Sequence, residues 1–230
     1  MPPSNSTERA DGELRKIALV REAYRNQAGV IVPSVTEILE TLAKPWLVKW
    51  AWKLGLEKIH YATYSSSLAE VGTLVHQSCM GLLADGKLPA IEADPAIRSL
   101  ADSSILKFMA WYERRKIKPI LIEKRLVSEK YQYGGQEDIF ALIDGIPEIL
   151  EIKTSDSIHE EHRIQGAAYG KLIEEQGGNI PRPEGVRILS LPRTDKESFD
   201  ESVKRNTSAE WMIFWHLLNI HKLRKREEKS

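Results

Sequence analysis

Residues 134–153, GGQEDIFALIDGIPEILEIK, constrain the fold more than any other part of the chain. The runs 139–143 and 146–152 are apolar and β-prone, and the Asp144-Gly145 pair between them is a turn signal. This pattern predicts a β-hairpin. Several charged residues interrupt it, and three of them bear on function: Asp138, Glu151 and Lys153.

Strand geometry indicates that these three charged side chains share one face of the hairpin. Glu151 and Lys153 are two residues apart, so they point the same way. With a tight turn about Gly145-Ile146, antiparallel pairing sets Asp138 opposite Lys153 and Phe140 opposite Glu151, and paired residues lie on one face. Pro147 cannot donate the closing hydrogen bond, and a register shifted by one residue would move Asp138 to the other face.

Charged groups on an apolar hairpin are costly to bury unless something binds them. Hard cations such as Mg²⁺ and Mn²⁺ take oxygen ligands, which Asp138, Glu151 and the carbonyl of Ile152 could supply. Lys153 beside such a cation is suited to stabilise charge or to orient a water that attacks a phosphate. The alternative is an ion-paired surface hairpin, because carboxylates and lysines at this spacing are common in charged proteins.

Short motifs on both sides of the hairpin complete an ordered set. In chain order the set reads Gly72-Thr-Leu-Val-His76, Gly135 ahead of Asp138, Glu151-Ile-Lys153 and Gln165-Gly-Ala-Ala-Tyr169. It resembles the PD-(D/E)xK nuclease superfamily and, within it, the RecB-like exonuclease branch. The resemblance covers residues 72–169, and Glu137 departs from it by standing where the superfamily name implies proline.

The resemblance implies a restriction-endonuclease-like core and metal-dependent hydrolysis of DNA, with Mg²⁺ or Mn²⁺ as the cofactor. Asp138, Glu151 and the carbonyl of Ile152 would bind the metal, and Lys153 would assist the attacking water. Gln165 and Tyr169, which share a helix face at a spacing of four, would position the DNA strand or the water.

Two further metal ligands follow from the same resemblance. His76 is a candidate ligand that would favour Mn²⁺, since imidazole is the softer donor, and a packed or exposed helical histidine is the alternative. Glu123 is a candidate third carboxylate, and the alternative is a strand glutamate paired with Lys124 or Arg125.

The remaining elements follow from periodicity and capping signals. They are a hairpin within 16–32, helices that open at Ser34 and Pro45, helices at 67–83, 95–114, 158–175 and 210–226, and strands at 117–127 and 186–191. Residues 33–39, PSVTEIL, resemble a P-S-V-T-x-I-L pattern near the start of phage and mitochondrial RecB-like exonucleases, although a well-capped helix also explains Ser34 and Glu37.

Aromatic and basic residues offer places where a nucleic acid could bind. Trp46 and Trp50 lie on one helix face and Trp52 on another; core packing is the favoured interpretation, and stacking on unpaired bases is the alternative. The basic run at 114–118 suits either a phosphate backbone or a solvated helix end.

Composition limits the classes of function. The formal net charge is zero, so contact with DNA must come from a local basic patch and the metal. The single cysteine, Cys79, excludes a disulfide framework and the four-cysteine iron–sulfur cluster of some RecB-like nucleases. No apolar run approaches the roughly 18 residues of a membrane span, and the start lacks a signal-peptide core. We expect a cytoplasmic protein of a bacterium or a phage-infected cell, with no membrane partner.

The order of elements predicts a mixed α/β fold, with a small central mixed β-sheet flanked by helices. We expect a disordered arm at 1–13, an N-terminal hairpin and helical elaboration at 14–116, and the nuclease core at 117–230, compact with the preceding part. The expected function is an exonuclease acting on DNA ends or single strands, in DNA recombination or repair. The alternatives are a structure-specific endonuclease on the same scaffold and a non-catalytic DNA-binding module.

Overall fold

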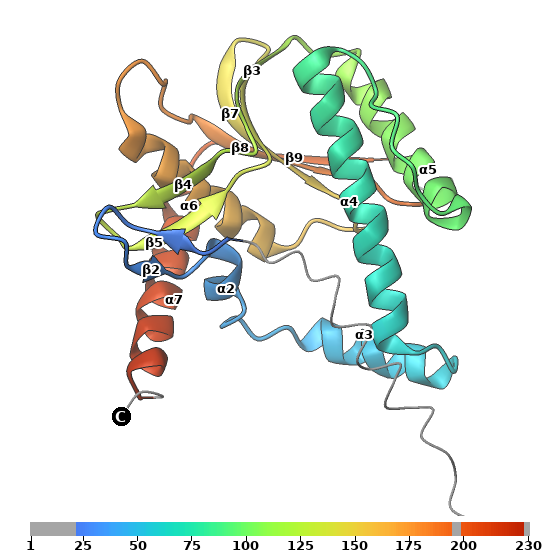
Figure 1. The fold of residues 1–230 in the computed structure, drawn as a ribbon, viewed down its shortest axis with the longest axis horizontal. Coiled ribbons are helices and arrows are strands. Elements are labelled where there is room, and N and C mark those ends of the chain that lie inside the picture. Colours follow the sequence, from blue (N-terminus) through green and yellow to red (C-terminus); the bar gives the residue numbers. More distant parts are fainter. Residues whose placement is uncertain (1–21, 195–198, 228–230) are drawn as a thin grey trace, which may run out of the picture.

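The computed structural model describes residues 22–194 and 199–227 (Figure 1). The arm expected at 1–13 and the first residues of the expected hairpin lie outside these ranges. The helices are α2 (Val35–Leu39), α3 (Pro45–Leu56), α4 (Tyr61–Asp85), α5 (Pro95–Tyr112), α6 (Glu160–Gln176) and α7 (Ser208–Glu227). The strands are β1 (Tyr24–Arg25), β2 (Ile31–Val32), β3 (Ile117–Ile122), β4 (Arg125–Ser128), β5 (Tyr133–Gln136), β6 (Ile139–Ile143), β7 (Ile146–Lys153), β8 (Gly185–Ser190) and β9 (Asp200–Lys204).

The predicted fold class is confirmed. Five strands form the central sheet in the order β3-β6-β7-β8-β9. The pair β7 and β8 is parallel, with α6 as the crossover between them, and the other pairs are antiparallel. The sheet is therefore mixed, and the β6–β7 hairpin lies inside it.

Helices cover both faces of this sheet (Figure 1). On one face, Ile139, Ala141, Leu150 and Ile152 belong to a core cluster with side chains of α4 and α5. On the other face, Phe140 and Ile149 belong to a cluster with side chains of α2, α6 and α7. The strict alternation along β6 and β7 buries one set of residues against each layer.

The β6–β7 turn forms where the Asp144-Gly145 signal predicted it. Both residues have positive φ, 51° and 88°, as a type I′ turn requires. The predicted register is wrong by two residues, because the pairing closes at Ile143 opposite Ile146 and sets Phe140 opposite Ile149. A shift of two residues conserves the side-chain faces, so the charged groups still converge.

The strand predicted at 117–127 is interrupted. Strand β3 ends at Ile122, and Glu123 adopts a positive φ of 48°. Strand β4 then pairs with β5 in a separate two-stranded sheet. The prediction that Glu123 lies within a strand is therefore wrong, because the backbone leaves the central sheet at this residue.

The core packing favoured for the tryptophans is also wrong for Trp46, whose exposed fraction is 45%. Trp50 is half-buried and packs edge-on against Tyr61, with ring centroids 5.3 Å apart. Among the helices of the described ranges, none is both long and apolar enough to cross a lipid bilayer.

Candidate active site

The charged residues of the hairpin meet where β6 begins and β7 ends. Asp138 directly precedes β6, while Glu151 and Lys153 are among the last three residues of β7. The Glu151 side chain is only 1% exposed. A carboxylate buried this deeply needs polar partners.

Those partners form a chain of hydrogen bonds that runs from β7 to α6. Lys153 Nζ donates to Glu151 Oε2 at 2.9 Å and to Gln165 Oε1 at 3.0 Å. Gln165 Nε2 in turn donates to Tyr169 Oη at 2.8 Å. The helix α6 thus turns Gln165 and Tyr169 toward the hairpin on one face, and the lysine ammonium is held at two points.

A second set of contacts surrounds Asp138. Its Oδ2 accepts a hydrogen bond from the Ile152 N–H at 2.8 Å, and its own N–H faces Glu151 Oε1 at 3.5 Å. His76, which α4 supplies, has Nδ1 3.4 Å from Asp138 Oδ1 and Nε2 2.9 Å from the Ile152 carbonyl oxygen. The imidazole therefore bridges two of the oxygen donors that the sequence singled out.

Proximity shifts the pKa values of these groups. Burial, and then the Asp138 carboxylate, raise the pKa of Glu151 to about 7. Burial favours the neutral form of Asp138, but His76 and Lys153 outweigh it and lower its pKa. Burial would lower the pKa of Lys153, yet the Glu151 and Asp138 carboxylates dominate and raise it. Likewise Asp138 outweighs burial and raises the pKa of His76.

Gly135 is required for space beside this network. A Cβ at this position would lie 2.6 Å from Tyr169 Cε1 and 2.9 Å from Val35 Cγ2. By contrast, a Cβ at Gly72 would meet Thr154 Oγ1 at 3.6 Å, which is an ordinary contact. Of Gly72 and Gly135, only Gly135 has a steric reason in the structure.

Glu123 lies at the edge of the same region. Its N–H donates to the Asp138 carbonyl oxygen at 3.0 Å, and its exposed side chain lines the cleft in front of Asp138. Glu137, which the sequence marked only as a departure from proline, is buried and accepts a hydrogen bond from the Lys124 N–H at 3.1 Å. Burial raises the pKa of Glu137 to about 7. Its place in the sequence, directly before Asp138 and the apolar strand β6, was the signal that could have marked it.

The donor chemistry fits a hard cation, since two carboxylates, a carbonyl and an imidazole belong to one network of contacts. In the described conformation these donors are engaged with Lys153, with the Ile152 N–H and with one another. Across residues 22–194 and 199–227, no three His, Cys, Asp or Glu side chains are gathered in a metal-binding arrangement. The ligand set therefore stays a prediction.

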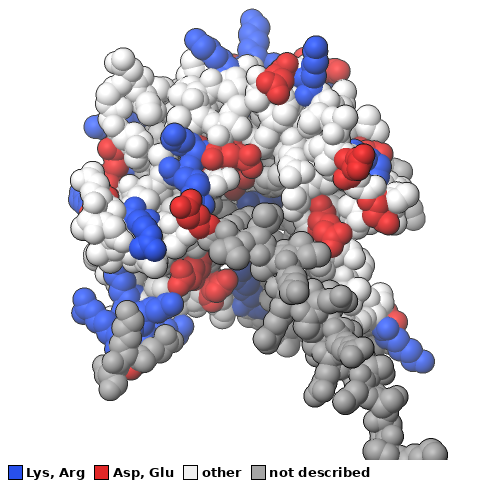
Figure 2. All heavy atoms as spheres, in the orientation of Figure 1, with Lys and Arg blue, Asp and Glu red and all other residues white. Residues whose placement is uncertain are grey.

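A cleft of about 610 Å³ opens in front of the network. Asp138, Lys153, His76 and Tyr169 line it on one side, and Glu37 of α2 lies on its rim. Glu37 pairs with Lys225 at 3.1 Å and with His221 at 3.4 Å, both from α7. Figure 2 shows Lys and Arg side chains gathered over this end of α7, so positive charge lies close to the cleft in a chain of zero net charge.

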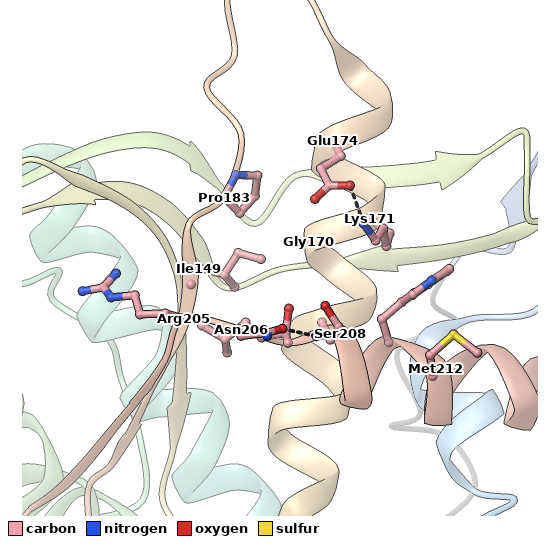
Figure 3. A pocket seen from close by; sticks show the side chains of 14 residues that line it. Ile149, Gly170, Lys171, Glu174, Pro183, Arg205, Asn206, Ser208 and Met212 are labelled. Atoms are coloured by element: carbon pink, nitrogen blue, oxygen red, sulfur yellow. Dashed lines mark hydrogen bonds and ion pairs between the residues drawn. The ribbon is translucent and has the colours of Figure 1, made fainter.

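Another pocket, of about 530 Å³, lies between α6 and α7, and Gly170 is one of the residues that line it (Figure 3). Ile149, Arg205 and Met212 line it. None of the candidate catalytic side chains reaches it. The chemistry predicted from the sequence therefore belongs to the cleft at Asp138.

Comparison with known proteins gives limited similarity. No protein-family model matches the sequence, and no curated protein matches it. A structure described as LHK-Exo in complex with dAMP aligns at 10% identity and a TM-score of 0.34, covering 71% of this chain and 87% of that one. A structure of the alkaline exonuclease LHK-Exo from Laribacter hongkongensis aligns at 12% identity and a TM-score of 0.29, covering 70% of this chain and 97% of that one. Both TM-scores lie below 0.5, so neither likeness carries a conclusion about this chain.

Proposed function

We propose that this chain is a metal-dependent DNA nuclease that hydrolyses phosphodiester bonds, acting as an exonuclease on ends or single strands. One observation carries the proposal: the Lys153 ammonium is fixed between Glu151 and Gln165, beside the Asp138 carboxylate and at the wall of an open cleft. A positive charge held in this way is suited to act on a phosphate and on the water that attacks it.

Asp138, Glu151 and the Ile152 carbonyl are the proposed ligands of Mg²⁺ or Mn²⁺, with His76 as a fourth. A bound cation of this kind lowers the pKa of a water and neutralises charge on the phosphate. The His76 ring now contacts both the Asp138 carboxylate and the Ile152 carbonyl, so these contacts would have to open for the two oxygens to hold a cation.

The chain's own residues supply orientation and charge. Lys153 Nζ orients the attacking water, whose oxygen forms a new bond to phosphorus while the bond to the leaving oxygen breaks. The proton that the water loses ends, through solvent, on that leaving oxygen. Gln165 holds Lys153 through its Oε1, and Tyr169 fixes the amide of Gln165 through its hydroxyl group. These contacts hold the Lys153 ammonium in one place, so the water and the phosphate meet it in a geometry that suits the attack.

The first test is digestion of end-labelled linear and closed circular single-stranded DNA with Mn²⁺, Mg²⁺ or EDTA. Loss of the linear strand with the circle spared, and only with metal, is the expected result. Cleavage of the circle would replace the exonuclease with an endonuclease on the same scaffold. If neither substrate is cut with either metal, the nuclease proposal fails and a DNA-binding module takes its place.

A further inference from the structure

Helix α3 leaves most of its aromatic surface uncovered. All of its residues are described, and Leu54 is the one that is buried. Trp46 is 45% exposed and Trp52 is 66% exposed. In Figure 1, α3 lies beside the first turns of α4, away from the central sheet. Single exposed apolar side chains are ordinary on protein surfaces, so these indoles gain meaning only from what surrounds them.

Trp46 differs from the other exposed aromatics because one of its faces is already occupied. Its indole stacks on the His159 imidazole, with ring centroids 5.0 Å apart and planes inclined by 11°. His159 is the N-cap residue of α6, the helix that carries Gln165 and Tyr169. The indole is therefore fixed in orientation relative to the proposed active site.

The segment that carries this indole is basic, while α6 adds Glu160 and Glu161 directly after His159. Residues 44–58 contain four lysines against the single Glu57, in a chain whose net charge is zero. Lys49 is three residues after Trp46, so the two side chains are neighbours on the helix surface. Lys44, the residue that caps α3, pairs with Glu161 of α6 at 3.2 Å.

Helix α6 connects this surface with the active site. Its start contacts α3, through the stack of His159 on Trp46 and the ion pair of Glu161 with Lys44. One turn further along α6, Gln165 accepts a hydrogen bond from Lys153 at 3.0 Å. A strand whose phosphate lies at Lys153 and that follows the start of α6 would therefore reach Trp46.

We propose that Trp46, held flat on His159 and accompanied by Lys44 and Lys49, stacks an unpaired base of the nucleic acid strand that enters the cleft. This inference rests on the proposed nuclease function and specifies its substrate as a strand with unpaired bases at this position. An aromatic face stacks on any base, and adjacent lysines attract the phosphates, which is how single strands are bound without sequence preference. A base paired in a duplex has both faces covered and does not present one to Trp46.

The test is fluorescence anisotropy with a labelled single-stranded oligonucleotide and with a blunt duplex of the same sequence, in EDTA so that no strand is cut. Trp46→Ala should weaken binding of the single strand about tenfold, which is the usual size of one lost base–aromatic stack. Trp46→Phe should retain most of the affinity, and duplex binding should not change. Trp52→Ala is the matched control, because it removes an exposed indole from another face of the same helix.

Three results would overturn the stacking position. They are unchanged binding by Trp46→Ala, equal loss for single strand and duplex, and equal loss in Trp52→Ala. A Trp46→Ala protein that changes from oligomer to monomer in sedimentation would show instead that another copy covers the indole. Circular dichroism excludes unfolding of each variant. The proposed nuclease function is tested separately, by cleavage of DNA with the wild-type protein, so failure of that proposal is distinguishable from failure of the stacking proposal.

Discussion

Lys153 is the residue on which the proposed chemistry most depends. Its ammonium donates hydrogen bonds to Glu151 Oε2 and Gln165 Oε1. A neutral replacement therefore removes one positive charge from this position in the cleft wall. We expect Lys153→Met, which keeps an apolar stem, to reduce single-turnover cleavage by about 10²–10³-fold or more. Thermal unfolding should change little, because the raised pKa of Glu151 allows that carboxyl group to become neutral.

The matched control for this prediction is Lys171→Met on α6. Lys171 pairs with Glu174 at 2.6 Å on the helix surface, away from the cleft. Cleavage by this variant should equal that of the wild type. Full activity in Lys153→Met would contradict the role assigned to the ammonium.

Gly135 links packing to the same site. An alanine there would bring its Cβ within 2.6 Å of the Tyr169 ring, whose hydroxyl group holds Gln165. We expect Gly135→Ala to lower the free energy of unfolding by about 1–3 kcal/mol, as overpacking does, and to reduce cleavage as well. Urea denaturation measures the first effect.

Gly170→Ala provides the comparison, since a Cβ there meets Ile149 Cδ1 at 3.5 Å, an ordinary contact. Alanine in the interior of α6 should leave stability unchanged or increase it by up to about 1 kcal/mol. If both variants are equally stable, the steric argument for Gly135 is wrong.

At the scale of elements, the start of α6 depends on a histidine that stays neutral. His162 Nδ1 accepts a hydrogen bond from the His159 N–H at 3.3 Å, which protonation would prevent. Burial, and then the charge of Lys153, lower the pKa of His162 to about 3. The unfolded chain takes up this proton near pH 6.5, whereas the folded chain does not.

Stability should therefore be lost as pH falls from about 6.5 toward 3, by at most about 1.4 kcal/mol per pH unit from this one group. His162→Gln should flatten that part of the stability curve relative to the wild type, as measured by urea unfolding at a series of pH values. His216→Gln, at an exposed position of α7, should leave the slope unchanged. Parallel curves for wild type and His162→Gln would contradict the prediction.

Local signals predicted the elements better than their arrangement. The cap at Ser34, with its hydroxyl oxygen accepting from the Glu37 N–H at 3.0 Å, and the prolines at 45 and 95 mark helix starts correctly. The hairpin faces were also predictable, because a strand repeats every two residues whatever its register. The register was missed because the turn was expected one residue too far along the chain, about Gly145-Ile146. The break at Glu123 was missed because it depends on β4 pairing with β5 outside the central sheet.

The candidate site shows the same division. The spacing of Gln165 and Tyr169 and the faces of Glu151 and Lys153 follow from helix and strand periods. That His76 would lie against both Asp138 and the Ile152 carbonyl required the packing of α4 on the sheet, which no local pattern encodes. The exposure of Trp46 likewise depends on how little of α3 contacts the rest of the chain.

At the scale of the whole molecule, zero net charge makes the placement of basic residues decisive. The 114–118 run is partly used within the fold, because Arg115 pairs with Asp144 at 3.2 Å and with Glu201 at 3.0 Å. The last turn of α7 contains Arg224, Lys225 and Arg226, and Lys225 reaches Glu37 on the rim of the cleft. The end of α7 is thus the better placed cluster for a DNA backbone.

We therefore expect Arg224→Gln combined with Lys225→Gln to weaken DNA binding and to reduce the slope of log affinity against log salt by about 1–2, one unit or less for each lost phosphate contact. The control is Arg114→Gln combined with Lys118→Gln, which removes the same charge from exposed positions at the opposite end of the molecule (Figure 1). Anisotropy titrations at several salt concentrations separate a local contact from a general effect of net charge. If both pairs change the slope equally, net charge explains the binding, and the end of α7 does not contact the strand.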